Sequence, residues 1–116
     1  EWTDEEWICV MTHFTLNDLD QIIADRVSAD SKTSYTKTLL DAGTAKTTKK
    51  FGEESVEAII AVMQGDRSAI TAESADVLYH LLVMLRSAHV PLQEVMAELE
   101  KRTARSGIEE KNSRNG

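Results

Sequence analysis

Few residues in this chain can interrupt a helix or form a cross-link. Its 116 residues include one proline, five glycines and a single cysteine, Cys9. A lone cysteine excludes an intrachain disulfide, so nothing in the sequence points to an oxidising compartment. The scarcity of proline and glycine leaves few breakpoints, which favours a small number of long helices joined by short turns.

Aromatic side chains and long apolar runs are also scarce. Aromatic residues make up 5% of the chain, whereas all hydrophobic residues together make up 41%. The core must therefore be built from Leu, Ile, Val, Ala and Met, which favours helices over a sandwich or barrel. No apolar run approaches the roughly 20 residues that a membrane helix needs, and no secretory signal is found. We therefore expect a cytoplasmic protein without a membrane partner.

The formal net charge is −7, and no basic stripe runs through the chain. This charge distribution argues against general nucleic-acid binding. An acidic excess suits a protein that gathers carboxylates around metal ions, and it suits equally well a protein that needs charge for solubility.

The length indicates a single domain. We place this domain at residues 15–105, between an N-terminal extension (1–14) and a polar C-terminal tail (106–116). Part of the extension is a candidate non-native segment because Met11 offers an alternative start.

The spacing of apolar residues predicts four or five helices and no sheet, an all-α fold. Helices are expected over about residues 16–28, 35–42, 45–64 and 68–88, with a last helix whose first turn contains Pro91. Thr15 and Ser34 are expected as N-caps, and Gly43 and Gly65 as helix ends.

Two acidic pairs lie on the two longest predicted helices. Glu54 and Glu57 are three residues apart on the first, and Glu73 and Asp76 are three apart on the second. Residues at this spacing share one helix face, and the short connection predicts antiparallel packing. We therefore expect four facing carboxylates, which repel unless protons or cations neutralise them. Hard divalent cations such as Mg²⁺ prefer such oxygen ligands.

A solvated acidic surface is the alternative interpretation of each pair taken alone. Asp76 argues against it, because aspartate is a poor helix former and here interrupts an almost wholly apolar run, residues 75–85. His80 shares the stripe of Glu73 and Asp76, although a histidine beside an apolar arc is more often a core residue. Lys46 and Lys50 precede the first acidic pair on its own stripe, where they are placed to hold phosphate oxygens.

The segments around these acids resemble a known family. KKFGEESVEAIIAV (49–62) followed by ESADVLYHLLVML (73–85) is similar to the core of the phosphoribosyl-ATP pyrophosphohydrolase family. That family is part of the all-α nucleotide pyrophosphohydrolase superfamily, together with MazG-type enzymes and dimeric dUTPases. The superfamily pattern, E-x-x-E followed by E-x-x-D, is met at the four acids. Narrower similarity lies in SYTKTLLDAG (34–43) and SGIEEKNSR (106–114).

The resemblance implies hydrolysis of phosphoribosyl-ATP to phosphoribosyl-AMP and pyrophosphate, the second step of histidine biosynthesis. It implies a MazG-like bundle of four or five helices whose core is completed in a homodimer. It also implies Mg²⁺, for which Mn²⁺ is a possible substitute, with Glu54, Glu57, Glu73 and Asp76 as metal ligands and catalytic residues. The residues expected to bind the nucleotide substrate are Tyr35, Thr36, Lys46, Lys49, Lys50, Glu53, His80, Lys111 and Arg114.

Two other functions remain open at this point. A house-cleaning nucleoside triphosphate pyrophosphatase of the same superfamily would share the metal ligands and differ in its base and ribose pocket. A non-catalytic helical module would form a dimer and merely bind a cation. The tail with Lys111 and Arg114 either folds onto substrate phosphates or is disordered.

Overall fold

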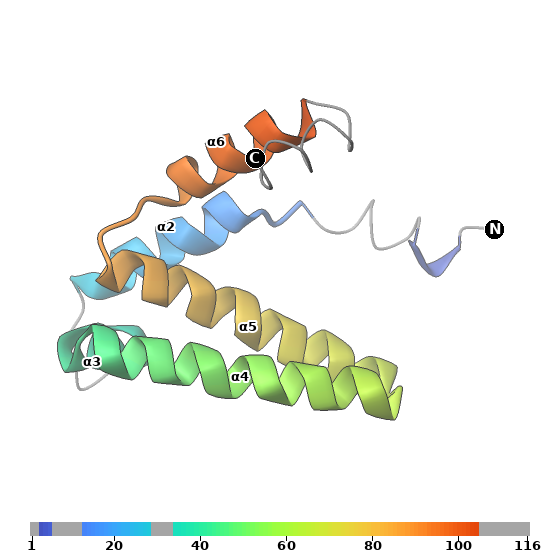
Figure 1. The fold of residues 1–116 in the computed structure, drawn as a ribbon. Coiled ribbons are helices and arrows are strands. Elements are labelled where there is room, and N and C mark those ends of the chain that lie inside the picture. The colour runs from blue at the N-terminus through green and yellow to red at the C-terminus, as the bar shows by residue number, and fades with distance from the viewer. Residues whose placement is uncertain (1–2, 6–12, 29–33, 105–116) are drawn as a thin grey trace, which may run out of the picture.

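The computed structural model describes residues 3–5, 13–28 and 34–104, and within them it contains helices α2 to α6 and no strand (Figure 1). The all-α prediction is thus confirmed, and the helix ends lie within about one residue of those expected. The helices are α2 (Leu16–Val27), α3 (Tyr35–Ala42), α4 (Thr44–Gln64), α5 (Arg67–Ser87) and α6 (Leu92–Thr103).

Local capping interactions explain these boundaries. The Thr15 side chain accepts a hydrogen bond from the Asp18 backbone N–H at 3.1 Å, while the Asp18 carboxylate accepts one from the Thr15 N–H at 2.9 Å. This capping box satisfies donors that the start of α2 would otherwise leave unpaired. The Ser34 hydroxyl caps α3 by accepting a hydrogen bond from the Lys37 backbone N–H at 3.2 Å. Pro91 is the N-cap of α6, so it precedes the first turn in which we expected it.

Helices α4 and α5 form a long antiparallel hairpin (Figure 1). Gly65 ends α4 with a φ of 75°, a left-handed conformation that glycine adopts without a steric penalty. At the opposite end of the hairpin, the hydroxyl groups of Thr47 and Ser87 are hydrogen-bonded at 2.7 Å. The Thr44 hydroxyl donates to the Ser87 carbonyl at 3.3 Å. The hairpin is therefore tied at both ends, which fixes its register.

The hydrophobic core gathers around the C-terminal half of α5. Its buried members come from four helices: Ile23, Leu39, Leu82, Val83 and Leu92. Complete burial of one such side chain contributes about 1.5–3 kcal/mol. Arg86 of α5 also donates to the Asp20 carboxylate of α2 at 3.2 Å, which ties these two helices beside the core.

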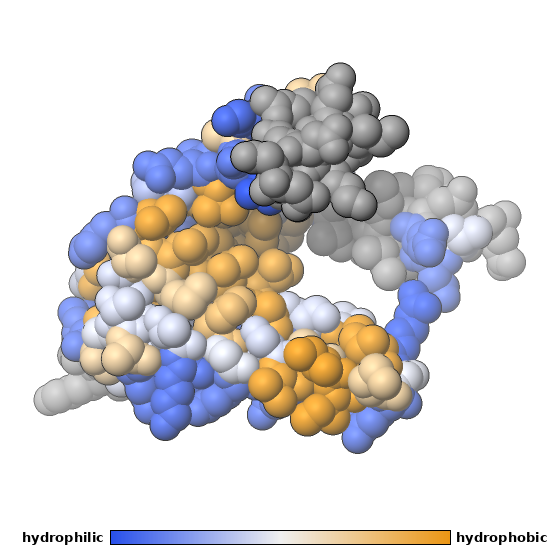
Figure 2. All heavy atoms as spheres, in the orientation of Figure 1, coloured by the Kyte–Doolittle hydropathy of each residue, from blue (hydrophilic) through white to orange (hydrophobic). Residues whose placement is uncertain are grey.

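The other half of the hairpin leaves the core and exposes apolar side chains. Figure 2 shows an apolar patch over this end of the molecule. Its α4 members are Val56, Ile59, Ile60, Val62 and Met63, and Met63 is 82% exposed. Such a contiguous apolar surface is typical of an interaction site.

One helix bears on the expectation that the chain has no membrane-spanning segment, namely α5. This helix has 21 residues and is long and apolar enough to cross a membrane, by length and composition alone. The core helix of a soluble protein meets the same criteria. Because α5 also carries Glu73 and Asp76, burial in lipid would be costly.

Candidate metal centre

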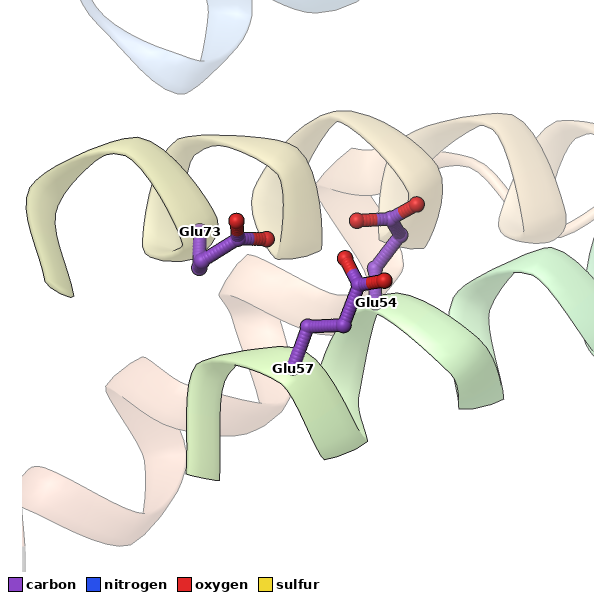
Figure 3. Close-up of side chains that lie close together, drawn as sticks. All are labelled: Glu54, Glu57 and Glu73. Carbon is purple, nitrogen blue, oxygen red and sulfur yellow. The ribbon is translucent and has the colours of Figure 1, made fainter. Parts of the chain in front are cut away.

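Three carboxylates meet between α4 and α5 (Figure 3). Glu54 and Glu57 come from successive turns of α4, and Glu73 comes from the facing side of α5. One oxygen of each lies within 4.8 Å of the other two. The Glu73 Oε2 atom is buried and has no hydrogen-bond partner among the described residues. The three side chains offer only oxygen ligands, directed at a common point.

The structure places Asp76 differently from the other three predicted ligands. Its side chain is exposed, and Asp76 is not part of the group that meets within 4.8 Å. Its charge nevertheless raises the pKa of both Glu54 and Glu73. Asp76 therefore contributes negative potential to the cluster from its edge.

Burial and mutual repulsion disfavour ionisation of this cluster. The pKa of Glu54 is raised by burial first, and then by the charge and the hydrogen bond of Glu57. The pKa of Glu73 is raised by the same causes, with burial again the largest. Carboxylates that are hard to ionise together are stabilised by a proton or by a cation, which is the electrostatic property of a metal site.

Lys50 is the cation that lies beside the cluster. Its Nζ atom is 3.6 Å from Glu53 Oε2 and 3.7 Å from Glu54 Oε1. The pKa of Lys50 is raised, chiefly by Tyr35 and then by the two glutamates. The expected neighbours Lys46 and Lys49 are exposed. Of the three predicted lysines, Lys50 is thus the one that the structure pairs with the acids.

The predicted substrate residues of α3 and α5 divide into one exposed and two buried side chains. Tyr35 is 54% exposed, and its ring lies parallel to that of Tyr79 at 6.5 Å. Thr36 is only 1% exposed and shares a hydrogen bond with the Tyr79 hydroxyl, and its expected contact with substrate stays a prediction. His80 is also buried, with its Nδ1 atom 2.9 Å from the Asp76 carbonyl oxygen.

Tyr79 is a neighbour of the site that the sequence reasoning did not single out. Its ring meets the His80 ring edge-on at 4.9 Å. The sequence feature that could have indicated it is a tyrosine next to a histidine inside an apolar run. Both side chains carry polar groups that need hydrogen-bond partners when they are buried. Lys111 and Arg114, also expected at the substrate, lie outside the described residues.

Comparison with known proteins gives one consistent result. The family model for phosphoribosyl-ATP pyrophosphohydrolase matches residues 16–103. A phosphoribosyl-ATP pyrophosphatase of Methylobacterium nodulans is 57% identical over 104 residues, covering 90% of this chain and 97% of that protein. One of Rhizobium johnstonii is 53% identical with the same coverage, and one of Rhizobium rhizogenes is 52% identical over 90% of this chain and its own full length.

The raised pKa values of Glu54 and Glu73 predict a specific pH dependence without metal. The folded state holds protons on these carboxyls more tightly than the unfolded state does. The free energy of unfolding should therefore fall as pH rises from the usual pKa of a glutamate through the raised pKa of the folded state. Glu57→Gln removes a charge that raises both pKa values. In EDTA at about pH 7, the free energy of unfolding of Glu57→Gln should equal or exceed that of the parent. Between about pH 7 and pH 5, the free energy of unfolding of the variant should change less than that of the parent.

Urea unfolding at the two pH values measures this difference. Glu94→Gln, an exposed substitution on α6, is the matched control and should retain the parent's pH dependence. A clear loss of stability for Glu57→Gln at neutral pH would mean that the cluster is a stabilising polar network.

Proposed function

This chain belongs to the phosphoribosyl-ATP pyrophosphohydrolase family, and on that premise we propose that it hydrolyses phosphoribosyl-ATP to phosphoribosyl-AMP and pyrophosphate. This is the second step of histidine biosynthesis. The observation that carries the proposal is the convergence of Glu54, Glu57 and Glu73 between α4 and α5. We place the reaction in the cytoplasm, because the substrate is a free nucleotide and the sequence permits no intrachain disulfide.

The donor chemistry of the cluster fits Mg²⁺, with Mn²⁺ as a substitute. Both are hard cations that select carboxylate oxygens, and Mg²⁺ usually retains waters and binds through few carboxylates together with substrate phosphates. Glu54, Glu57 and Glu73 would hold the metal, and Asp76 would add charge or complete the ligand set. When bound, the cation would screen the phosphate charge and lower the pKa of a coordinated water.

The chain's own residues then have separable tasks. The ammonium group of Lys50, about 3.7 Å from the Glu54 carboxylate, is placed to exchange that partner for a phosphate oxygen. Lys46, Lys49 and Glu53 line the same exposed stretch of α4 and would contact the polyphosphate and its bound cations. Attack of water on phosphorus forms a new P–O bond, breaks the anhydride bond and releases one proton. A carboxylate of the cluster accepts that proton while pyrophosphate leaves.

A homodimer would account for the exposed half of the α4–α5 hairpin. Ile59 and Met63 lie on α4 beyond the core, and Leu78 adds an exposed apolar side chain on α5. Association with a second copy would bury these groups, and each square ångström of apolar surface removed from water contributes about 25 cal/mol. The acidic cluster lies on the same hairpin, so the interface and the site would be adjacent.

The activity prediction is that Mg²⁺-dependent release of pyrophosphate is faster from phosphoribosyl-ATP than from ordinary nucleoside triphosphates. Glu54→Gln should reduce this rate by orders of magnitude, since metal-ion catalysis contributes on the order of several kcal/mol. Glu94→Gln should react like the parent. Faster release from ordinary triphosphates would indicate a house-cleaning enzyme, and release from none would indicate a non-catalytic module.

The dimer prediction concerns Ile59, which is exposed in the single chain. In a monomer, replacing an exposed side chain changes stability by less than about 0.5 kcal/mol. In a dimer, Ile59→Asp would bury a charge and should shift micromolar protein from dimer to monomer in light scattering. Asp25→Asn on α2 serves as the exposed control. A parent chain that is monomeric at this concentration would contradict the proposal.

A further inference from the structure

Tyr35 presents an aromatic ring to solvent at the start of α3. The residue is 54% exposed, although its ring is in contact with two others. The ring of Tyr79 lies nearly parallel to it, at an interplanar angle of 17° and a centroid distance of 6.5 Å. The ring of His80 meets it edge-on at 6.3 Å. The ring is therefore supported by its neighbours, while much of its surface is open to a ligand.

The turn of α3 that carries Tyr35 is anchored as well. The hydroxyl groups of Thr36 and Tyr79 share a hydrogen bond, which ties this turn to α5. The Ser34 cap closes the same turn from its N-terminal side. A ligand that meets the ring thus finds it already in place, and such preorganisation lowers the entropy cost of binding.

The contact with His80 places this ring on the side of the hairpin that carries the acids. His80 follows Glu73 by seven residues, and seven residues are nearly two full turns of an α-helix. His80 therefore lies on the same face of α5 as Glu73, about 10 Å further along the helix axis. On the antiparallel α4, Lys50 lies one turn from Glu54 in the same direction, with its Nζ atom 3.7 Å from the carboxylate. Acids, cation and aromatic ring thus follow one another along the hairpin.

This order matches the order of groups in a nucleotide. The phosphates would bind at the acids through a cation and at Lys50, and the ribose separates the phosphates from the base by a distance of the same order. The flat face of a base stacks on an aromatic side chain, which Tyr35 offers. Phe14, the other exposed aromatic residue of the described segments, precedes α2 and therefore a helix that carries none of the clustered acids.

We propose that Tyr35 stacks on the purine of the substrate and selects a purine that carries a positive charge. In phosphoribosyl-ATP the second ribose is attached to a ring nitrogen of adenine, and this substitution leaves the purine protonated at neutral pH. A cation is attracted to the electron-rich face of a tyrosine ring, whereas the neutral adenine of ATP gains only the stacking. The inference rests on the proposed function for the identity of the purine. It assigns to Tyr35 the distinction between this substrate and ordinary nucleoside triphosphates.

The first test measures KM and kcat for Mg²⁺-dependent release of pyrophosphate from phosphoribosyl-ATP. Tyr35→Leu removes the aromatic face and should raise KM about 5- to 100-fold with little change in kcat, because the stacking is present in the ground state and the transition state alike. Tyr35→Phe keeps a ring and should stay within about threefold of the parent. Asp41→Asn, an exposed substitution on the same helix, is the control. A KM for Tyr35→Leu within about twofold of the parent's overturns the inference.

The second test concerns the charge of the base and does not depend on turnover. The chain contains two tyrosines, so comparison with Tyr35→Phe identifies the ring protons of Tyr35 in NMR spectra. In Mg²⁺ buffer, 1-methyl-AMP, whose purine is cationic, should shift these signals and bind at least about threefold more tightly than AMP.

Unshifted Tyr35 signals overturn the inference, as does an equal preference for 1-methyl-AMP in Tyr35→Leu, followed by its backbone signals. Shifted signals in a parent chain that releases no pyrophosphate from phosphoribosyl-ATP would support the stacking and refute the proposed function.

Discussion

The register between α4 and α5 determines the position of every other part of the site. The Thr47–Ser87 hydroxyl pair fixes one end of the hairpin, and the left-handed Gly65 fixes the turn at the other. Only in this register do the acids of α4 face Glu73. Since each residue advances about 100° around a helix, a slip of one position would turn the carboxylates away from one another.

This register brings like charges together, which should weaken the metal-free fold and favour the binding of a cation. The opposing contribution comes from the core around Leu82 and Val83, which lies at the other end of α5. The acidic cluster thus lies between the packed half of the hairpin and its exposed apolar half. The proposed metal-dependent homodimer would explain both features, because the cation would offset the repulsion and the second copy would cover the apolar surface.

Features that depend on residues close together in the chain could be predicted from the sequence. Features that depend on how the helices pack against one another could not. The caps at Thr15 and Ser34 and the three-residue spacing of the acids involve one or two helix turns, so sequence alone indicates them. The exposure of Asp76 depends on how α5 is rotated against α4, which no local pattern determines. Thr36 is buried because α3 packs on α5 through Tyr79, a contact between residues 43 positions apart.

The measurement that tests the central claim most directly is the free energy of unfolding as a function of Mg²⁺ concentration at neutral pH. Protein concentration should be held constant, and KCl of equal ionic strength should serve as the reference. If the cation binds the native cluster between α4 and α5, the free energy of unfolding should increase with Mg²⁺ concentration. Once that concentration exceeds the dissociation constant, each tenfold increase should add about 1.4 kcal/mol. Equal effects of Mg²⁺ and KCl would contradict the claim, since the gathered carboxylates would then hold no specific cation.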